Sequence, residues 1–450
     1  MAFLNALFLL LAPHALAVST EQPNIPMPAG VLQLSLFPVP PTNKTDGQAL
    51  TGRQVSVEAD NYRYFPSTYP ALGTVIDIGT PPQRVIVEPD TGSKVIWVPR
   101  LPPGHQRQGY ESTFFDASQS SSIQEFGQNI TYKFVSGEQF VVEGYWDDVS
   151  LEGQPVGRMI VGVVDLNGPN TAINRHDGIL ALRPSSSQDD NSFMPRKLFN
   201  QKIVRSTAFS LGVRQHERGS LTFGGYDTSK FSGPLEKLEM VPGTNYRSSS
   251  IFIQRVSFNR GGGQDVVIVD SKSNQGNPVD LGLDSGAAGF RLPPSILQDF
   301  TANTGATVNQ DFVEFGCDII DSGVAIDFHI TDNTVISVPL SDFVSGRKDS
   351  GRICTLAIAF KQQPEATAFI WMGRHFYRRA YVVHDWDSRA VYVGRGADCG
   401  STVVAIDGIM PDNVIGNCAH QEPERDQQPP VAPGSIRTAP MPPHNPWYSP

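Results

Sequence analysis

The sequence predicts a soluble all-β protein, and three observations carry that prediction. Only 18% of the 450 residues are charged, whereas an average soluble domain has about 25%. The chain contains 41 glycines and 36 prolines, which favour turns over long helices. Short β-branched or aromatic runs alternate with turn sequences, at residues 75–78, 85–87 and 96–98. The length allows two lobes that each bury a core.

Later in the chain the same pattern predicts a hairpin and one helix. Residues 209–213 and 220–223 alternate apolar with small or polar side chains, and Gly224-Gly225 supplies a turn after them. Residues 295–300 have helical character, and Pro293 and Pro294 stand where prolines are tolerated at a helix start. We therefore expect few helices among many strands.

Composition changes divide the chain into five segments. We expect a signal peptide at residues 1–17, a proline-rich and loosely structured prosegment or linker at 18–60, lobes at 61–243 and 244–400, and a C-terminal extension at 401–450. The polar, turn-rich stretch around residues 243–250 marks the junction of the lobes. The extension is expected to be Pro-rich and disordered from about residue 421.

The first 17 residues resemble a secretory signal. Residues 2–11 are apolar and uncharged, and Ala15-Leu16-Ala17 provides the small residues of a cleavage site. A membrane anchor is the alternative, but the run is shorter than a bilayer span requires. We expect a secreted, extracellular protein without a membrane anchor; a vacuole- or lysosome-like compartment is the alternative destination.

Export would place the cysteines in an oxidising compartment, where two disulfides are expected. Three pairings remain open, of which neighbour pairing closes the shortest loops; free buried thiols are the alternative. The residues concerned are Cys317, Cys354, Cys399 and Cys418. Two Asn-x-Thr triplets also make Asn43 and Asn129 candidate glycosylation sites.

Two short acidic turns carry the candidate chemistry. Asp90-Thr91-Gly92-Ser93 and Asp284-Ser285-Gly286 each follow an apolar strand-like run and precede another. If two such turns faced each other, their carboxylates would share a proton, so that one Asp could activate water while the other polarises a carbonyl. The triplet alone is weak evidence, because Asp321 and Asp349 begin further Asp-Ser-Gly copies that read as ordinary turns.

An ordered set of motifs selects between these copies. The first half contains residues 72–83, Asp90 to Ser93, Trp97-Val98-Pro99, residues 115–118, 130–132, 144–145, 177–180 and 219–227; the second half contains Asp284 to Gly286, Leu292-Pro293, Cys317, Cys354, Met372-Gly373, Phe376 and Val393-Gly394. This set, across residues 70–397, resembles the secreted, fungal-type pepsin-like aspartic peptidases. The resemblance implies a bilobal acid-protease fold, with two pseudo-symmetric β-barrel-like lobes and the active-site cleft between them.

Carried over residue by residue, the resemblance assigns the site. Asp90 and Asp284 would be the catalytic dyad. Thr91 and Ser285 would cross-bond the two loops, Gly92 and Gly286 would permit their close approach, and Ser93 would donate to Asp90. Tyr132 would be the tyrosine of a flap that closes over substrate, with Trp97 supporting its hydroxyl; a cross-strand pair and a core aromatic are the respective alternatives.

Several residues depart from the family pattern. Ala287 stands where Ser or Thr is common, so we expect altered pH dependence, and Ala181 replaces a usual glycine. Lys94 and Pro89, beside the first acidic turn, are unusual for the family. The flap is about two residues longer than in the family, so the family's substrate preference at the flap is not carried over. A family prosegment is typically basic, whereas residues 18–60 carry a net negative charge. Cleavage by another protease near Arg53, or the absence of a long prosegment, therefore stay open.

The predicted function is hydrolysis of protein or peptide substrates at acidic pH near bulky apolar residues. A catalytically impaired relative that binds or inhibits another protein is the alternative, and a two-carboxylate glycosidase has less support. The net charge of −10 argues against nucleic acid. We expect a monomer without metal or cofactor, since neither HExxH nor a zinc-type cysteine spacing occurs. Arg378-Arg379 is interpreted as a solvated face.

Overall fold

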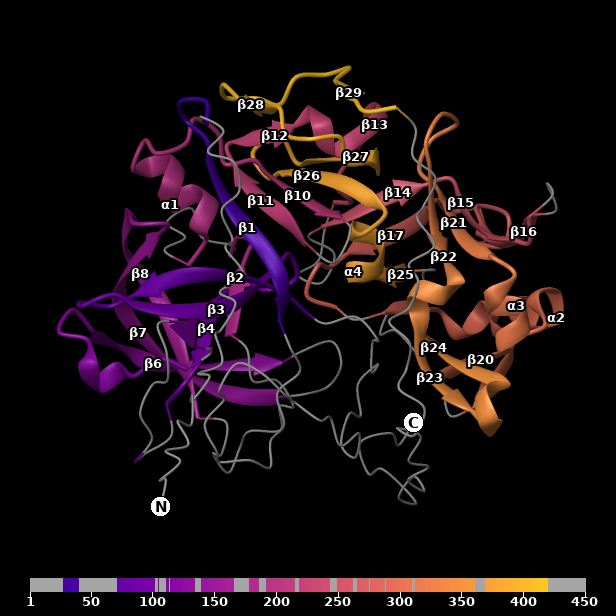
Figure 1. The fold of residues 1–450 in the computed structure, drawn as a ribbon, viewed down its shortest axis with the longest axis horizontal. Helices are drawn as coiled ribbons and strands as arrows, with labels where there is room; N and C mark the ends of the chain where they lie inside the picture. The colour runs from indigo at the N-terminus through magenta and orange to yellow at the C-terminus, as the bar shows by residue number, and fades with distance from the viewer. Residues whose placement is uncertain are drawn as a thin grey trace, which may run out of the picture.

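The computed structural model describes residues 27–39, 71–101, 104, 111–112, 114–133, 139–165, 178–185, 192–214, 218–242, 249–261, 265–274, 276–287, 289–309, 312–360 and 369–419, at some strand ends by their backbone alone. The signal peptide, Asn43, Arg53 and the tail beyond residue 419 lie outside these residues. Strands dominate the described chain, which confirms the all-β prediction. Figure 1 shows two bodies of strands on either side of a central sheet.

The first body is a sheet that closes on itself. Its strands are β2 (Ala71–Ile78), β3 (Gln83–Asp90), β4 (Ile96–Pro99), β5 (Glu111–Ser112), β6 (Gln124–Lys133), β7 (Gln139–Leu151), β8 (Gln154–Val164) and β9 (Gly178–Ala181). The order β2-β3-β9-β4-β8-β7 is completed by pairing of β7 with β2, which forms a barrel. The apolar runs predicted as strands are therefore β2, β3 and β4.

The central sheet joins the two halves of the chain. It contains β10 (Phe209–Arg214), β11 (Arg218–Phe223) and β13 (Phe231–Glu239) from the first half, and β26 (Ala380–Asp385) and β27 (Ala390–Gly396) from the second. β10 and β11 pair in the predicted hairpin, and β10 also pairs with β26. Helix α1 (Met194–Asn200) precedes this sheet.

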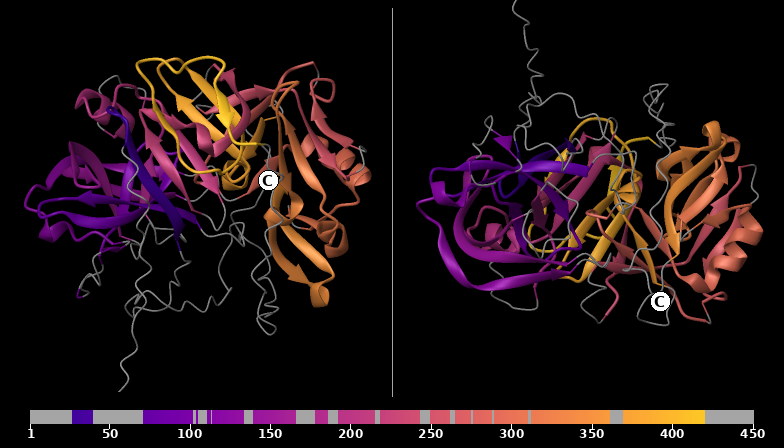
Figure 2. Two further views of the ribbon diagram at one scale, coloured as in Figure 1. Left: turned by 45° about the horizontal axis from the view of Figure 1, so that its top comes forward. Right: turned by 90° about the horizontal axis from the view of Figure 1, so that it is seen from below.

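The second body consists of two sheets. One contains β14 (Ser250–Ile253), β17 (Val279–Leu283), β18 (Phe290–Leu292), β19 (Thr307–Asn309), β20 (Phe312–Gly316), β23 (Val344–Lys348), β24 (Ile353–Phe360) and β25 (Phe369–Met372); the other has the order β16 (Asp265–Asp270), β15 (Arg255–Asn259), β21 (Ala325–His329) and β22 (Val335–Pro339). Its helices are α2 (Leu297–Thr304), α3 (Cys317–Asp321) and α4 (Arg374–Tyr377). Figure 2 shows the same division from two other directions.

No helix within the described ranges has the length and apolar character that crossing a membrane requires.

Strand β1 (Leu32–Val39) corrects the expectation that residues 18–60 are loosely structured throughout. β1 lies between β11 and β2 and pairs with both, so it connects the central sheet to the first barrel. Its alternation of polar and apolar residues places Leu34 and Leu36 in the core, at 0% and 2% exposure. Removing residues 18–60 as one piece would take these two side chains out of the core, expose the apolar residues they pack against, and leave the facing edges of β11 and β2 unpaired.

Arg378 and Arg379 do not form a solvated face. Arg378 is 9% exposed, and Arg379 donates two hydrogen bonds of 2.8 Å to the buried carboxylate of Asp342. A bidentate pair of this kind compensates the desolvation of both charges. The two arginines follow α4 inside the structure, where the sequence pattern alone had placed them at the surface.

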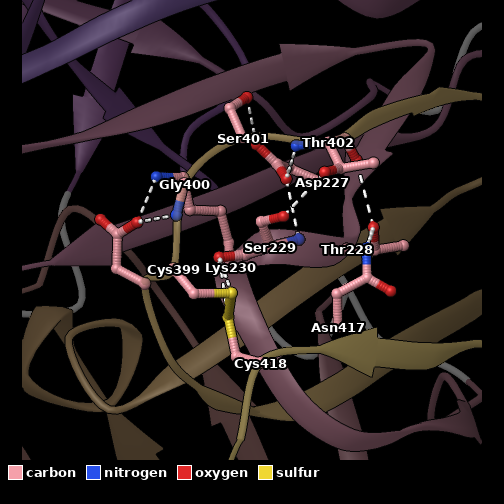
Figure 3. Close-up of a disulfide and its surroundings, with 11 residues drawn as sticks. Asp227, Thr228, Ser229, Lys230, Cys399, Gly400, Ser401, Thr402, Asn417 and Cys418 are labelled. Atoms are coloured by element: carbon pink, nitrogen blue, oxygen red, sulfur yellow. Dashed lines mark hydrogen bonds and ion pairs between the residues drawn. A yellow bond between two sulfur atoms is a disulfide. The ribbon is translucent and has the colours of Figure 1, made fainter.

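The C-terminal extension is described as far as residue 419, and this part packs on the first half of the chain. β28 (Val403–Ala405) pairs with β12 (Gly225–Asp227), and β29 (Ile415–Asn417) pairs with β13. The buried carboxylate of Asp227 accepts hydrogen bonds from Ser401 Oγ and from the backbone N–H of Thr402, both at 2.7 Å. Figure 3 shows these contacts beside the disulfide.

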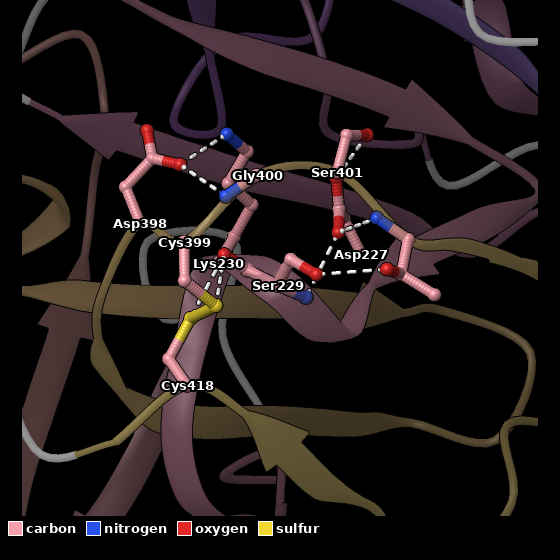
Figure 4. A network of polar contacts seen from close by, with 9 residues as sticks. Asp227, Ser229, Lys230, Asp398, Cys399, Gly400, Ser401 and Cys418 are labelled. Carbon is pink, nitrogen blue, oxygen red and sulfur yellow. Dashed lines mark hydrogen bonds and ion pairs between the residues drawn. A yellow bond between two sulfur atoms is a disulfide. The ribbon is translucent and has the colours of Figure 1, made fainter.

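Both disulfides join neighbouring cysteines. Cys317 is bonded to Cys354 inside the second body, and Cys399, which precedes β28, is bonded to Cys418, which follows β29. The second bond lies against Ser229, whose carbonyl is 3.1 Å from Cys418 Sγ, and Lys230 pairs with Asp398 alongside it (Figure 4). Residues 399–418 therefore form a closed loop that is fastened to β12 and β13.

Replacing Cys399 and Cys418 together by Ser is expected to lower the free energy of unfolding by about 3 kcal/mol, because the freed loop gains entropy in the unfolded chain. Urea unfolding followed by tryptophan fluorescence measures this change. The Cys317/Cys354 double variant is the comparison: its separation of 37 residues, against 19, predicts a larger loss of about 4 kcal/mol. An unchanged unfolding midpoint in the first variant would contradict the prediction.

Candidate active site

Two buried strands deliver the acidic turns to the same place. Asp90 is the last residue of β3, and Asp284 directly follows β17, whose five residues are all buried. Each turn is supported from the neighbouring strand: Asp90 C=O accepts from Leu182 N–H at 2.9 Å, and Asp284 N–H donates to Met372 C=O at 3.0 Å. A strand that stops at a rigid position fixes the direction in which its terminal carboxylate points.

Hydrogen bonds between the loops lock the two turns together. Thr91 N–H donates to Ser285 Oγ at 3.1 Å, and Ser285 N–H donates to Thr91 Oγ1 at 3.0 Å. Each hydroxyl then donates to a carbonyl of the opposite loop, Thr91 to Leu283 at 3.2 Å and Ser285 to Pro89 at 2.7 Å. Both side chains are buried, so all of these polar groups are satisfied without water. Each loop thus makes the same pair of hydrogen bonds to the other, as expected for two related half-sites.

The two glycines bring each loop against the opposite carboxylate. A Cβ placed on Gly92 would lie 2.6 Å from Asp284 Oδ2, and one on Gly286 would lie 2.5 Å from Asp90 Cγ. No side chain fits at these distances, because atoms in ordinary contact stay beyond about 3.5 Å. Glycine is therefore required at both positions, and each carboxylate lies against the loop that carries the other.

The two carboxylates differ in their hydrogen bonding. Asp90 Oδ1 accepts from Gly92 N–H at 2.7 Å, and Asp284 Oδ1 accepts from Gly286 N–H at 3.0 Å. Asp90 Oδ2 also accepts a short hydrogen bond from Ser93 Oγ. Ala287 occupies the corresponding position after Asp284, since its N–H bonds to Asp284 C=O just as Ser93 N–H bonds to Asp90 C=O. The second half-site has no hydroxyl at this point.

A buried chain of hydrogen bonds runs from Thr91 through Tyr377 to His384, and the sequence did not predict it. Tyr377 Oη lies 3.2 Å from Thr91 Oγ1 and 3.2 Å from His384 Nε2. Because the single Thr91 hydroxyl proton is donated to a carbonyl, Tyr377 must donate to Thr91 and accept from His384 Nε2–H. Complete burial lowers the pKa of His384 to about 3, which keeps the imidazole neutral, and burial raises the pKa of Tyr377. No local sequence pattern marks Tyr377 and His384. They lie on α4 and β26, and their link to Thr91 exists only because these elements pack against the acidic turns.

The other two Asp-Ser-Gly copies lie elsewhere. Asp321 ends α3 and forms an exposed ion pair with Arg347. Asp349 begins an exposed turn and pairs with Arg352 three residues later. Neither residue is hydrogen-bonded to the loops that carry Asp90 and Asp284 in the described contacts. Both are surface turns, in agreement with the interpretation of these triplets from sequence.

The flap region is described only in part. Tyr132 lies on β6 opposite Phe140 of β7, but its side chain is outside the described residues. Trp97 is fully buried, its ring packs edge-on against Phe140 at 5.2 Å, and its Nε1–H has no acceptor among the described residues. Asn129, three residues before Tyr132, has an exposed side chain on the same strand.

Several known proteins and one protein family are similar to this chain in sequence. The family model described as eukaryotic aspartyl protease matches residues 72–395. The chain is 26% identical to an acid protease of Saccharomycopsis fibuligera, over 72% of this chain and 80% of that protein. It is 26% identical to candidapepsin-3 of Candida albicans (86% and 96% covered) and 28% identical to cathepsin E of Cavia porcellus (69% and 77% covered).

The matched region contains both acidic turns, both bodies of strands and the central sheet. The chain therefore belongs to the eukaryotic aspartyl protease family and is an aspartic endopeptidase.

Proposed function

We propose that Asp90 and Asp284 are the catalytic dyad of this endopeptidase. The observation that carries the proposal is the reciprocal fit of Gly92 and Gly286, each against the carboxylate of the opposite loop. Two carboxylates held close together repel each other strongly when both are ionised, whereas a pair that shares one proton does not. Such a pair can act as base and acid in a single step.

The reaction then needs only the two side chains and water. The ionised carboxylate removes a proton from the water, whose oxygen attacks the peptide carbonyl carbon, while the protonated carboxyl group donates its proton to the carbonyl oxygen. The tetrahedral intermediate collapses when a proton passes to the amide nitrogen and the C–N bond breaks. The dyad recovers its single proton as the new carboxyl group forms. The rigid loops keep both carboxylates oriented throughout.

The proposed substrates are extended protein segments with bulky apolar side chains beside the cleaved bond. Such a segment would bind as an added strand, with backbone hydrogen bonds supplying affinity and side pockets supplying specificity. We further propose that residues 1–17 direct secretion and that acidic pH favours the reaction. Support comes from the signal-like sequence, from two disulfides, and from relatives named secreted aspartic protease in Candida albicans.

Cleavage of casein between about pH 3 and pH 7, with and without pepstatin, tests the proposal. We expect activity that is highest in the acid range and is abolished by pepstatin, the general inhibitor of the family. Activity that persists with pepstatin would exclude a carboxylate dyad. A folded protein that cleaves nothing at any pH would instead support the alternative of a catalytically impaired binding protein.

Replacing Ala287 by Thr is expected to shift the pH–activity profile to lower pH by up to about one unit. A hydroxyl beside Asp284 can donate to the carboxylate and so favours its ionised form. The profile of kcat/KM against pH measures the shift. Ala287→Val is the matched control, because valine has the shape of threonine without the hydroxyl. Identical profiles for the Thr and Val variants would show that no such hydrogen bond forms.

A further inference from the structure

A polar cluster lies on one face of the second body, on strands that do not contain the acidic turns. Asp265 begins β16, while Asp327 and His329 are two residues apart on β21 and share one face of that strand. Strand β15 separates the two. One potential ligand atom from each of the three side chains lies within 4.8 Å of the other two. The alternating residues Ile326 and Phe328 point to the core instead and are fully buried.

Asp327 is the unusual member of this cluster. The residue is only 5% exposed, and its Oδ2 accepts a hydrogen bond from Asn259 Nδ2 at 2.8 Å. Its Oδ1 is buried and has no hydrogen-bond partner in the described part of the chain. A buried carboxylate oxygen without a partner costs a few kcal/mol. A cation bound beside it would remove that cost.

The charge balance of the cluster also favours a cation. Asp265 and Asp327 bring two carboxylates close together, and no Lys or Arg among the described residues forms an ion pair with either. Arg255 pairs opposite His329 on β15, and its charge acts on that histidine. Two neighbouring carboxylates without an ion-pair partner repel each other, and a divalent cation between them would turn the repulsion into attraction.

The surroundings orient the ligands as they do in metal sites. Ser257 Oγ is 2.8 Å from His329 Nε2 and fixes the imidazole ring, and Asn259 fixes Asp327. Hydrogen bonds of this kind from β15 correspond to the outer shell that orients metal ligands. Ligands of Zn²⁺ bind at about 2.0–2.2 Å and so lie about 3–4 Å apart. The exposed Asp265 can close the remaining distance by a change of rotamer.

We propose that Asp265, Asp327 and His329 bind a divalent transition-metal ion of the Zn²⁺ type, with water completing the coordination. The imidazole selects Zn²⁺ over Mg²⁺ or Ca²⁺, which take oxygen ligands only. The ion would tie the edge strand β16 to β21 across β15 and so stabilise the second body. This role is independent of peptide hydrolysis. The chain has neither HExxH nor a zinc-type cysteine spacing, so the proposed site would use another ligand pattern, Asp-x-His on one strand together with Asp265 from a second strand.

The test uses the full secreted protein, stripped with EDTA and then dialysed against micromolar ZnCl₂. Metal content by mass spectrometry and the Tm from calorimetry are the readouts. We expect one Zn²⁺ per chain and a higher Tm with Zn²⁺ but not with equimolar MgCl₂. Asp327→Asn and His329→Gln should each weaken binding at least about tenfold, and Asn259→Ala by about 10–100-fold. Asp299→Asn, an exposed change on α2, is the matched control and should bind as the parent does.

Circular dichroism and the Tm in EDTA show whether each variant is folded; if Asp327→Asn is not, the half-buried His329→Gln carries the test. The proposal is overturned if the parent binds no stoichiometric Zn²⁺. It is equally overturned if His329→Gln retains the full metal content and the full rise in Tm, since the ion would then be bound elsewhere.

Discussion

Replacement of Asp284 by Asn is expected to lower kcat/KM for peptide cleavage by about 10⁴-fold or more, and replacement of Asp90 by Asn to do the same. Asparagine keeps the shape of the side chain but can neither ionise nor share a proton. Either change therefore removes the acid–base pair while leaving the hydrogen bonds between Thr91 and Ser285 in place. Steady-state cleavage of a fluorogenic peptide across the acid range measures the loss. The double variant should be no worse than either single variant, because the two residues act as a unit.

The chain contains its own controls for this experiment. Asp349→Asn and Asp321→Asn change the same residue type in the same Asp-Ser-Gly context, but on exposed turns with local ion pairs. Exposed pairs contribute at most about 1 kcal/mol, so both control variants should keep parental activity. If Asp90→Asn or Asp284→Asn retained a tenth of that activity, the dyad assignment would fail. Loss of activity in the controls would show that the assay responds to folding rather than to chemistry.

Between pH 6.5 and pH 3, His384 is expected to lower the free energy of unfolding of the parent protein by up to about 5 kcal/mol. His384→Gln is expected to remove this acid-dependent loss. The native pKa of His384 is lowered to about 3, whereas an unfolded histidine titrates near 6.5. Neutral His384 therefore makes its full contribution to stability above pH 6.5. As the pH falls from 6.5 towards 3, the unfolded state binds a proton that the native state does not, and the contribution is lost. Glutamine can still donate to Tyr377 but does not titrate, so the loss disappears.

Urea unfolding at pH 7, 5 and 3.5 measures this difference, in an Asp284→Asn background that prevents self-digestion. Tyr377→Phe is the matched control: it removes the hydroxyl next to His384 but keeps the titrating imidazole, so its dependence on pH should remain parental. Parallel stability curves for the parent and His384→Gln would contradict a buried, neutral histidine. The result bears on an enzyme proposed to work in acid, because the loops that hold Thr91 rest on this chain.

Local patterns predicted much of the secondary structure. The β-branched runs became β2, β3 and β4, and the predicted hairpin is β10 with β11. The helix expected at residues 295–300 exists but is displaced: a 3-10 turn spans Pro294–Ile296, and α2 runs from Leu297 to Thr304. Strand and turn propensities are local properties, so sequence reports them well, while element ends depend on packing.

β1 shows where local patterns fail. Its residues lie in a proline-rich stretch that suggested a loose linker, yet β11 and β2 both offer unpaired edges to it. Pairing partners almost 200 residues away decide whether such a segment is a strand. The same holds for the extension after residue 400, whose docking depends on the buried carboxylate of Asp227.

The sequence by itself determined the all-β class, the two acidic turns and, through the order of its motifs, the family. These features are carried by short contiguous stretches, whose chemistry is visible without a fold. Only the tertiary structure decided which two acidic turns lie together, how the cysteines pair, and that Tyr377 and His384 stand behind Thr91. The tertiary structure also decided that Asp265 lies beside Asp327 and His329. Each of these depends on distances between residues far apart in the chain, and such distances are set by strand pairing and burial rather than by local sequence.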